Sequence, residues 1–139
     1  MNVTKKQIKD VFIDLKKLKE MGIWYSGIKW EGEHKRWWGN GQLKIHCNYI
    51  KKIKYQGEYK QWYRDGQLKI HCHFNKDGEI EGESKEWYDN GQLFTHCFYR
   101  GTDDKRKKYK GKFKRWYDDG TLIQHFIYNN DGTVKEKIV

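Results

Sequence analysis

The chain has 139 residues, contains neither alanine nor proline, and 17% of its residues are aromatic. This length favours a single domain and excludes a large two-lobed enzyme with a deep cleft. The formal net charge is +10, from 29 Lys and Arg against 19 Asp and Glu, and it favours acidic partners: nucleic acid, an anionic membrane surface or an acidic protein.

The start of the chain has no apolar run of the kind found in secretory signals, and its three cysteines do not suggest a disulfide framework. We therefore expect a soluble, intracellular protein without disulfides.

Residues 1–22 are expected to form an amphipathic helix. Residues 4–21 carry apolar residues at helical spacing, a capping box at Thr4 and Gln7, and a natural stop at Gly22. The opposite side of this helix is rich in lysine. We interpret the helix as a lid that covers the first hairpin and protects the edge of a sheet. The alternative is a helix that lies on an anionic membrane.

Four similar segments follow, so that residues 23–128 form a tandem repeat. The copies span residues 32–49, 57–74, 82–99 and 111–128, with periods of 25, 25 and 29 residues between equivalent glycines. Such self-similarity indicates one supersecondary unit that packs against its neighbours. The remaining residues, 129–139, are predicted to form a turn and a last short strand that caps the array.

Each copy is predicted to be a β-hairpin, because Asn-Gly or Asp-Gly stands at its centre between alternating strands. A two-residue turn would pair Trp38 with Leu43, His34 with Cys47 and Gly32 with Tyr49. A three-residue loop with a glycine bulge is the alternative, and it would move Glu33 to the leucine face. We prefer the first register because it buries fewer charges.

The repeated pattern is Gly, four residues, Trp, an aromatic, any residue, Asn or Asp, Gly, any residue, Leu, and an aromatic six residues later. It resembles the MORN-repeat variant. The resemblance implies a mainly β fold, an elongated, twisted, single-layer antiparallel meander of hairpins, to which the N-terminal helix would add a cap. It also implies a role in protein binding or scaffolding and no catalytic residues. The resemblance also points to bacteria and large DNA viruses, in which proteins of this type are frequent, and to the antitoxins of toxin-antitoxin systems, as which some bacterial ones are described. The fourth copy departs from the pattern at Thr121 and Phe126.

Two rows of side chains are the candidate partner-binding residues. In the preferred register the tryptophans lie opposite the leucines, on the lysine face, where the histidines also lie. The rings could support the sheet by stacking on lysine stems. Alternatively they form a surface for a protein partner, since Trp is frequent in interface hot spots. The two rows are Trp37, Trp62, Trp87 and Trp116, and His46, His71, His96 and His125.

The His-Cys pairs at 46 and 47, 71 and 72, and 96 and 97 suggest zinc or a Cys-His nucleophile at first sight. Adjacent strand residues point to opposite faces, however, and equivalent residues of successive hairpins lie roughly 9.6 Å apart. We therefore expect no metal, no cofactor and no catalysis, and interpret the cysteines as small core residues.

The most basic segment is a candidate anion-binding site, with aromatic rings interleaved among its charges. It comprises Lys105, Arg106, Lys107, Lys108, Lys110, Lys112, Lys114 and Arg115. A solvated loop is the alternative interpretation. Our first hypothesis is thus a non-enzymatic module that binds a protein partner, and our second is a basic binder of nucleic acid or anionic lipid. An antitoxin that neutralises a toxin by direct binding is a further alternative, and homo-oligomerisation remains open.

Overall fold

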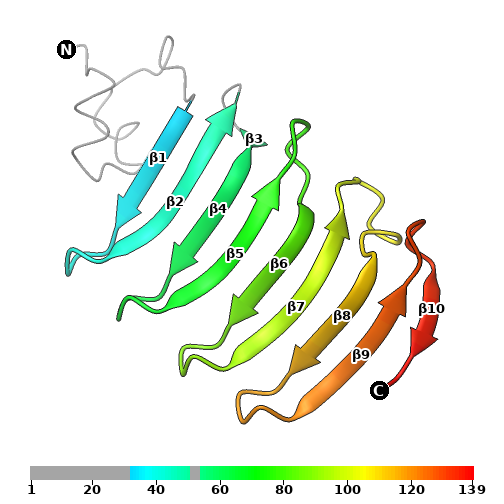
Figure 1. Ribbon diagram of the computed structural model, residues 1–139. Coiled ribbons are helices and arrows are strands. Elements are labelled where there is room, and N and C mark those ends of the chain that lie inside the picture. The colour runs from blue at the N-terminus through cyan, green and yellow to red at the C-terminus, as the bar shows by residue number, and fades with distance from the viewer. Residues whose placement is uncertain (1–31, 51–53) are drawn as a thin grey trace.

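The computed structural model describes residues 32–50 and 54–139. The helix predicted for residues 1–22 lies outside these residues. The described residues form one open antiparallel sheet of ten strands in a single layer (Figure 1), in the order β1-β2-β4-β5-β6-β7-β8-β9-β10, with β3 beside β2. The strands are β1 (Gly32–Trp37), β2 (Leu43–Ile50), β3 (Lys54–Tyr55), β4 (Gly57–Trp62), β5 (Leu68–Phe74), β6 (Glu81–Trp87), β7 (Leu93–Arg100), β8 (Gly111–Trp116), β9 (Leu122–Tyr128) and β10 (Val134–Lys137). The predicted meander of hairpins and the predicted last strand are confirmed.

The hairpin turns are three-residue loops with glycine at positive φ, so the preferred two-residue turn is wrong. In the first copy the Trp38 amide donates to the Gln42 carbonyl at 2.7 Å, and the Gly41 amide donates to the Trp38 carbonyl at 3.0 Å. Gly41 has a φ of 85°, which glycine adopts without strain. The same two bonds recur in the other three copies.

A β-bulge then restores the preferred register further along each hairpin. Trp37 pairs with Leu43, but Arg36 pairs with Ile45, so that Lys44 has no partner opposite it. The remaining pairs run as expected from the two-residue turn, ending with Gly32 opposite Tyr49. Every copy shifts at the same place. The loop alters the pairing by one residue, and the bulge cancels that change.

The bulge changes which side chains share a face of the sheet. Alternation along β1 is undisturbed, so Trp37 lies on the face of Lys35, and its direct partner Leu43 lies there too. Leu43 was predicted to share the face of Cys47, and this is wrong. We call the side with Glu33, Lys35, Trp37 and their equivalents the histidine face, because His46 pairs with Lys35. The other side, with Cys47 and its equivalents, is the cysteine face.

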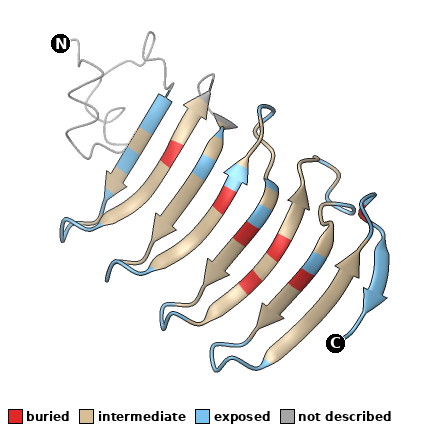
Figure 2. Ribbon diagram, in the orientation of Figure 1, coloured by how far each residue is buried: buried red, intermediate tan, exposed pale blue. Residues whose placement is uncertain are grey.

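The core lies on the cysteine face. Cys47, Cys72 and Cys97 are at most 4% exposed, as is Phe113, and Figure 2 shows the buried residues as short bands within the strands. Tyr55 and Tyr109, from the segments between copies, each pack against three rings. Tyr55 contacts Tyr49, Tyr59 and Phe74, and Tyr109 contacts Tyr99, Phe113 and Tyr128. Aromatic rings therefore supply the apolar surface that a chain poor in aliphatic residues lacks.

The facing strands of neighbouring hairpins pair through two residue pairs each, and a further pairing with the segment that leads into the next hairpin joins the copies at the end away from the turns. Ile45 pairs with Gln61 and His46 with Lys60 between the first and second copies. The equivalent pairs join the later copies, including across the longer segment before the fourth. At the turns, further bonds connect the copies: the Asn40 side chain donates to the Arg64 carbonyl at 2.7 Å. Backbone pairing is thus longer within a hairpin than between hairpins, but each junction is joined both near the turns and at the opposite end.

Candidate partner-binding face

The histidine face brings together both rows of residues that the sequence singled out. Each tryptophan lies two positions after a lysine of the same strand, and each of these lysines pairs with a histidine of the next strand. Trp37 is 38% exposed, and the other three tryptophans are partly exposed. The predicted proximity of Trp, Lys and His is therefore confirmed.

A carboxylate connects lysine and histidine in each of the first three copies. His46 Nε2 lies 3.0 Å from Glu33 Oε1, and Lys35 Nζ lies 3.2 Å from the same oxygen. In the next two copies the carboxylate divides its oxygens between the two partners, with 3.0 Å to each histidine and 3.4 and 3.6 Å to the lysines. These three glutamate triads are Glu33-Lys35-His46, Glu58-Lys60-His71 and Glu83-Lys85-His96.

The triads lower the pKa of their carboxylates. The hydrogen bond from Lys35 is the largest cause for Glu33, and those from His71 and His96 are the largest for Glu58 and Glu83. About half of each glutamate side chain is exposed to solvent. Exposed pairs of this kind add little to stability, so their effect is to order side chains on the surface.

The fourth copy has no such triad, because Lys112 occupies the glutamate position. Lys114 pairs with His125 as in the other copies. The Nε2 atom of His125 is buried and has no hydrogen-bond partner, and neither Lys112 nor Lys114 forms an ion pair with any residue that the structure describes. Among the four described copies, the fourth is thus the one in which the lysine and histidine have no glutamate two residues before the lysine.

A groove on the histidine face lies between the second and third hairpins. Its volume is about 430 Å³, and its lining includes His71 and Glu58 from one triad and Glu83 and Lys85 from the next. The strands β5 and β6 pair at Ile70 and His71, are not paired with each other at Cys72 and His73, and meet again where Phe74 pairs with Ile80, next to β6. The face is therefore recessed between these two copies rather than flat.

The tryptophan backbone also connects neighbouring copies. The hydroxyl of Tyr63 donates to the Trp87 carbonyl at 2.7 Å, and that of Tyr88 donates to the Trp116 carbonyl at 3.0 Å. In the first copy the indole Nε1 of Trp38 donates to the Trp62 carbonyl at 3.2 Å. These bonds need the tryptophan carbonyls but not the rings of Trp62, Trp87 and Trp116, which leaves the rings available for other contacts.

The cysteines do not form a reactive or metal-binding site. All three are free and buried, and burial raises the pKa of Cys47 to about 11 and that of Cys72 and Cys97 to about 12. Such thiols are inert at neutral pH. Among residues 32–50 and 54–139, no group of three or more His, Cys, Asp or Glu could hold a metal ion. Within the same residues, no helix is long and apolar enough to cross a membrane.

The basic segment does not form one patch, because strand alternation divides it. Lys105, Arg106 and Lys107 are exposed in a loop, whereas Lys112 and Lys114 lie on the histidine face. Arg115 lies on the cysteine face, with its guanidinium over the rings of Phe94 and Phe113 at 5.4 and 5.5 Å. Lys108 and Lys110 belong to the partly buried segment that leads into β8, where Lys108 Nζ is 4.8 Å from the Tyr109 ring.

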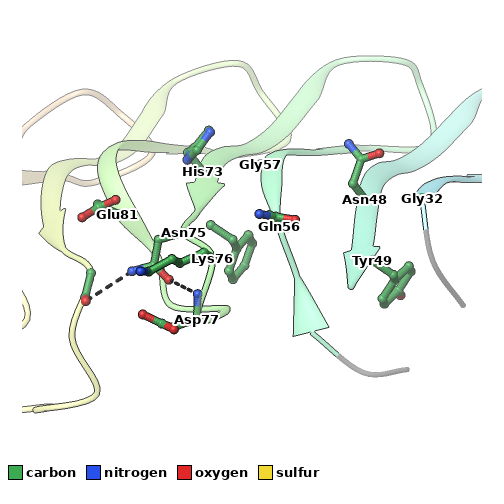
Figure 3. A pocket seen from close by; sticks show the side chains of 12 residues that line it. Gly32, Asn48, Tyr49, Gln56, Gly57, His73, Asn75, Lys76, Asp77 and Glu81 are labelled. Carbon is green, nitrogen blue, oxygen red and sulfur yellow. Dashed lines mark hydrogen bonds between the residues drawn. The ribbon is translucent and has the colours of Figure 1, made fainter. Parts of the chain in front are cut away.

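A larger open groove, of about 1140 Å³, lies at the end of the hairpins away from the turns (Figure 3). Asn75 shapes its floor: its Oδ1 accepts from the Asp77 amide at 2.9 Å, and its Nδ2 donates to the Gly101 carbonyl at 3.3 Å. Because these polar atoms bond to the backbone, they serve the loop structure. Tyr49 and Phe74 also line the groove, and their rings already pack against Tyr55.

A family model described as the MORN repeat variant matches four segments of the chain, residues 30–51, 55–76, 80–100 and 109–130. These segments coincide with the four hairpins. Neither a curated protein nor a solved structure matches the chain significantly.

Proposed function

Because the chain belongs to the MORN repeat variant family, we propose that it is a non-enzymatic binding module whose histidine face docks a protein partner. The observation that carries this proposal is the row of four partly exposed tryptophans beside ordered charges on one face. Trp is enriched among interface hot spots, and the apolar stems of neighbouring lysines can extend the surface beside the rings. The cysteine face is less suited, since its central residues are buried against one another.

The array would act as a platform of repeated sites. Equivalent tryptophans of successive copies are two strands apart, roughly 9.6 Å at ~4.8 Å per strand. Each of the first three tryptophans, Trp37, Trp62 and Trp87, stands next to a triad that fixes the position of a carboxylate and two basic groups. A partner that contacts two or three copies would therefore meet apolar rings and charges in a fixed order. Neutralisation of a toxin by direct contact is one use of such a platform.

The test compares single substitutions that leave the connecting bonds intact. Trp62→Gln and Trp87→Gln remove rings from the middle of the row but keep the backbone carbonyls. Tyr117→Gln is the matched control, because this ring is 54% exposed at the fourth turn and lies outside the row. Partners are first captured from the native source with the unmodified chain, and affinities are then measured for each variant.

We expect the free energy of unfolding of both tryptophan variants, measured by denaturant, to stay within about 0.5 kcal/mol of that of the unmodified chain. We expect each to weaken partner binding about 30-fold, the equivalent of about 2 kcal/mol for a hot spot. Equal losses of folding and binding would show that the rings only support the sheet. A steep decrease of binding with salt would instead favour nucleic acid or anionic lipid.

A further inference from the structure

The four copies allow one site to be compared with three internal references. A lysine of the first strand pairs with a histidine of the second strand in every copy, in the same register. In three copies a glutamate two residues before the lysine bonds to both. The backbone positions of Lys114 and His125 therefore match those of a triad, although Nε2 of His125 is buried and the side chains of the triad histidines are 30–39% exposed.

The fourth copy lacks the acid and carries an additional base. Lys112 stands where the glutamates stand, and it is exposed on the histidine face. His125 Nε2 is buried without a partner, which is unfavourable for a polar atom. The nearest glutamate of the third copy, Glu83, is already bonded to His96 and Lys85. Glu136 of β10 lies on the same face, where it pairs with Ile127, but it forms no ion pair with Lys112 or Lys114, and His125 Nε2 has no acceptor among the described residues.

We propose that Lys112, Lys114 and His125 bind a carboxylate from an acidic segment of the partner protein. This inference rests on the proposed binding function and specifies which chemical group of the partner the fourth copy recognises. The Asp or Glu side chain of the partner takes the place of the missing glutamate, with one oxygen toward Lys114 and the other toward His125. Lys112 adds a second positive charge at the entrance.

A carboxylate fits better than other anions because the first three copies show the geometry directly. In the second and third copies one carboxylate oxygen lies 3.0 Å from His Nε2 and the other lies 3.4 or 3.6 Å from Lys Nζ. The two basic groups are thus spaced for a planar group with two oxygens. Because Nε2 of His125 has no contact with solvent, its bond forms only after the side chains that cover it move aside.

The experiment titrates the full chain with an acetylated hexaglutamate peptide at low salt and follows the imidazole signals of the histidines by NMR. We expect the His125 signals to shift and saturate, while those of the triad histidines change little. Lys112→Glu supplies the acid within the chain, as in the other copies, and should weaken peptide binding at least tenfold. It should also raise the denaturant midpoint, since His125 then has its acceptor.

Lys105→Glu is the matched control, because it makes the same charge change at an exposed position of the neighbouring loop. It should weaken peptide binding less than about twofold, as expected for an exposed charge. Equal losses for the two variants, or unshifted His125 signals, would overturn the proposal. Tighter binding of an oligothymidylate with the same His125 shift would assign the site to phosphate and also overturn it. If Trp62→Gln abolishes partner capture but Lys112→Glu does not, the binding function stands and this inference fails.

Discussion

Replacing Tyr63 with phenylalanine tests whether the hairpins are held together at their turns. The change removes one hydroxyl, which donates to the Trp87 carbonyl of the next copy at 2.7 Å. The phenol is partly buried, and burial raises its pKa. The ring itself stays in place, so packing is nearly unchanged. The effect should therefore come from the lost hydrogen bond and from the carbonyl left without this donor.

A typical intramolecular hydrogen bond contributes about 0.5–1.5 kcal/mol to stability. With a urea dependence of about 1–3 kcal/mol per molar, a loss of about 1 kcal/mol lowers the midpoint by roughly 0.3–1 M. Tyr88→Phe should behave in the same way, because its hydroxyl donates to the Trp116 carbonyl at 3.0 Å. Urea unfolding followed by tryptophan fluorescence measures both shifts.

Tyr117→Phe is the matched control. Tyr117 occupies the same position of the fourth copy, beside which β10 rather than another repeat copy lies among the described residues, and it is 54% exposed. Its hydroxyl has no acceptor among the residues that the structure describes, so the free energy of unfolding should change by less than about 0.5 kcal/mol. Similar shifts for Tyr63→Phe and Tyr117→Phe would refute the argument that bonds between copies stabilise the array.

Three further outcomes are expected from the same structure. Gly132→Ala should destabilise more than Gly41→Ala, because both glycines have a φ of 85° but only the Cβ at 132 would lie 2.5 Å from the Lys107 carbonyl oxygen; urea midpoints would contradict this if equal. Asp65→Asn should raise the free energy of unfolding by about 0.5–1 kcal/mol, since the new amide can donate to the next turn as Asn40 does while Oδ1 still accepts from the Gln67 amide and only an exposed bond from the Gln67 side chain is lost; an unchanged free energy would argue against the new bond. Stability should be complete below pH 9 and decrease as the pH rises toward 11–12, because folding raises the cysteine pKa values above those of the unfolded chain; a midpoint equal at pH 8 and 10.5 would contradict it.

The sequence predicts the hairpin array well because the repeat, the turn dipeptides and the strand alternation agree. It predicts the turn wrongly for a physical reason. We compared two registers that each continue along the whole hairpin. The protein instead has the three-residue glycine loop at the turn, and beyond the bulge it has the register of the two-residue turn. The bulge at Lys44 reconciles them. The adjacent aromatic residues before the turn, Trp37 and Trp38 in the first copy, place one ring on each face in either register, so they do not distinguish the two-residue turn from the three-residue loop.

The triads could have been predicted, and the dispersal of the basic segment could have been predicted in part. Lys35 and His46 are partners in the preferred register, and Glu33 lies on the same face two residues away. Comparing this position across copies shows Glu three times and Lys112 once. The burial of His125 Nε2 could not be predicted, because it depends on side chains packed around it. The same holds for Arg115, whose position over Phe94 depends on how two hairpins meet.

The longer segment between the third and fourth copies shows how this architecture can tolerate insertions. The period there is 29 residues instead of 25, yet His96 still pairs with Lys114 as His46 pairs with Lys60. The additional residues form a loop that closes where the Arg100 amide donates to the Lys108 carbonyl at 2.9 Å. Tyr109 then re-enters beside Tyr99, as Tyr55 does beside Tyr49. Sequence gained at this boundary alters neither the order nor the orientation of the copies, so such proteins can acquire new loops during evolution while they keep the same face.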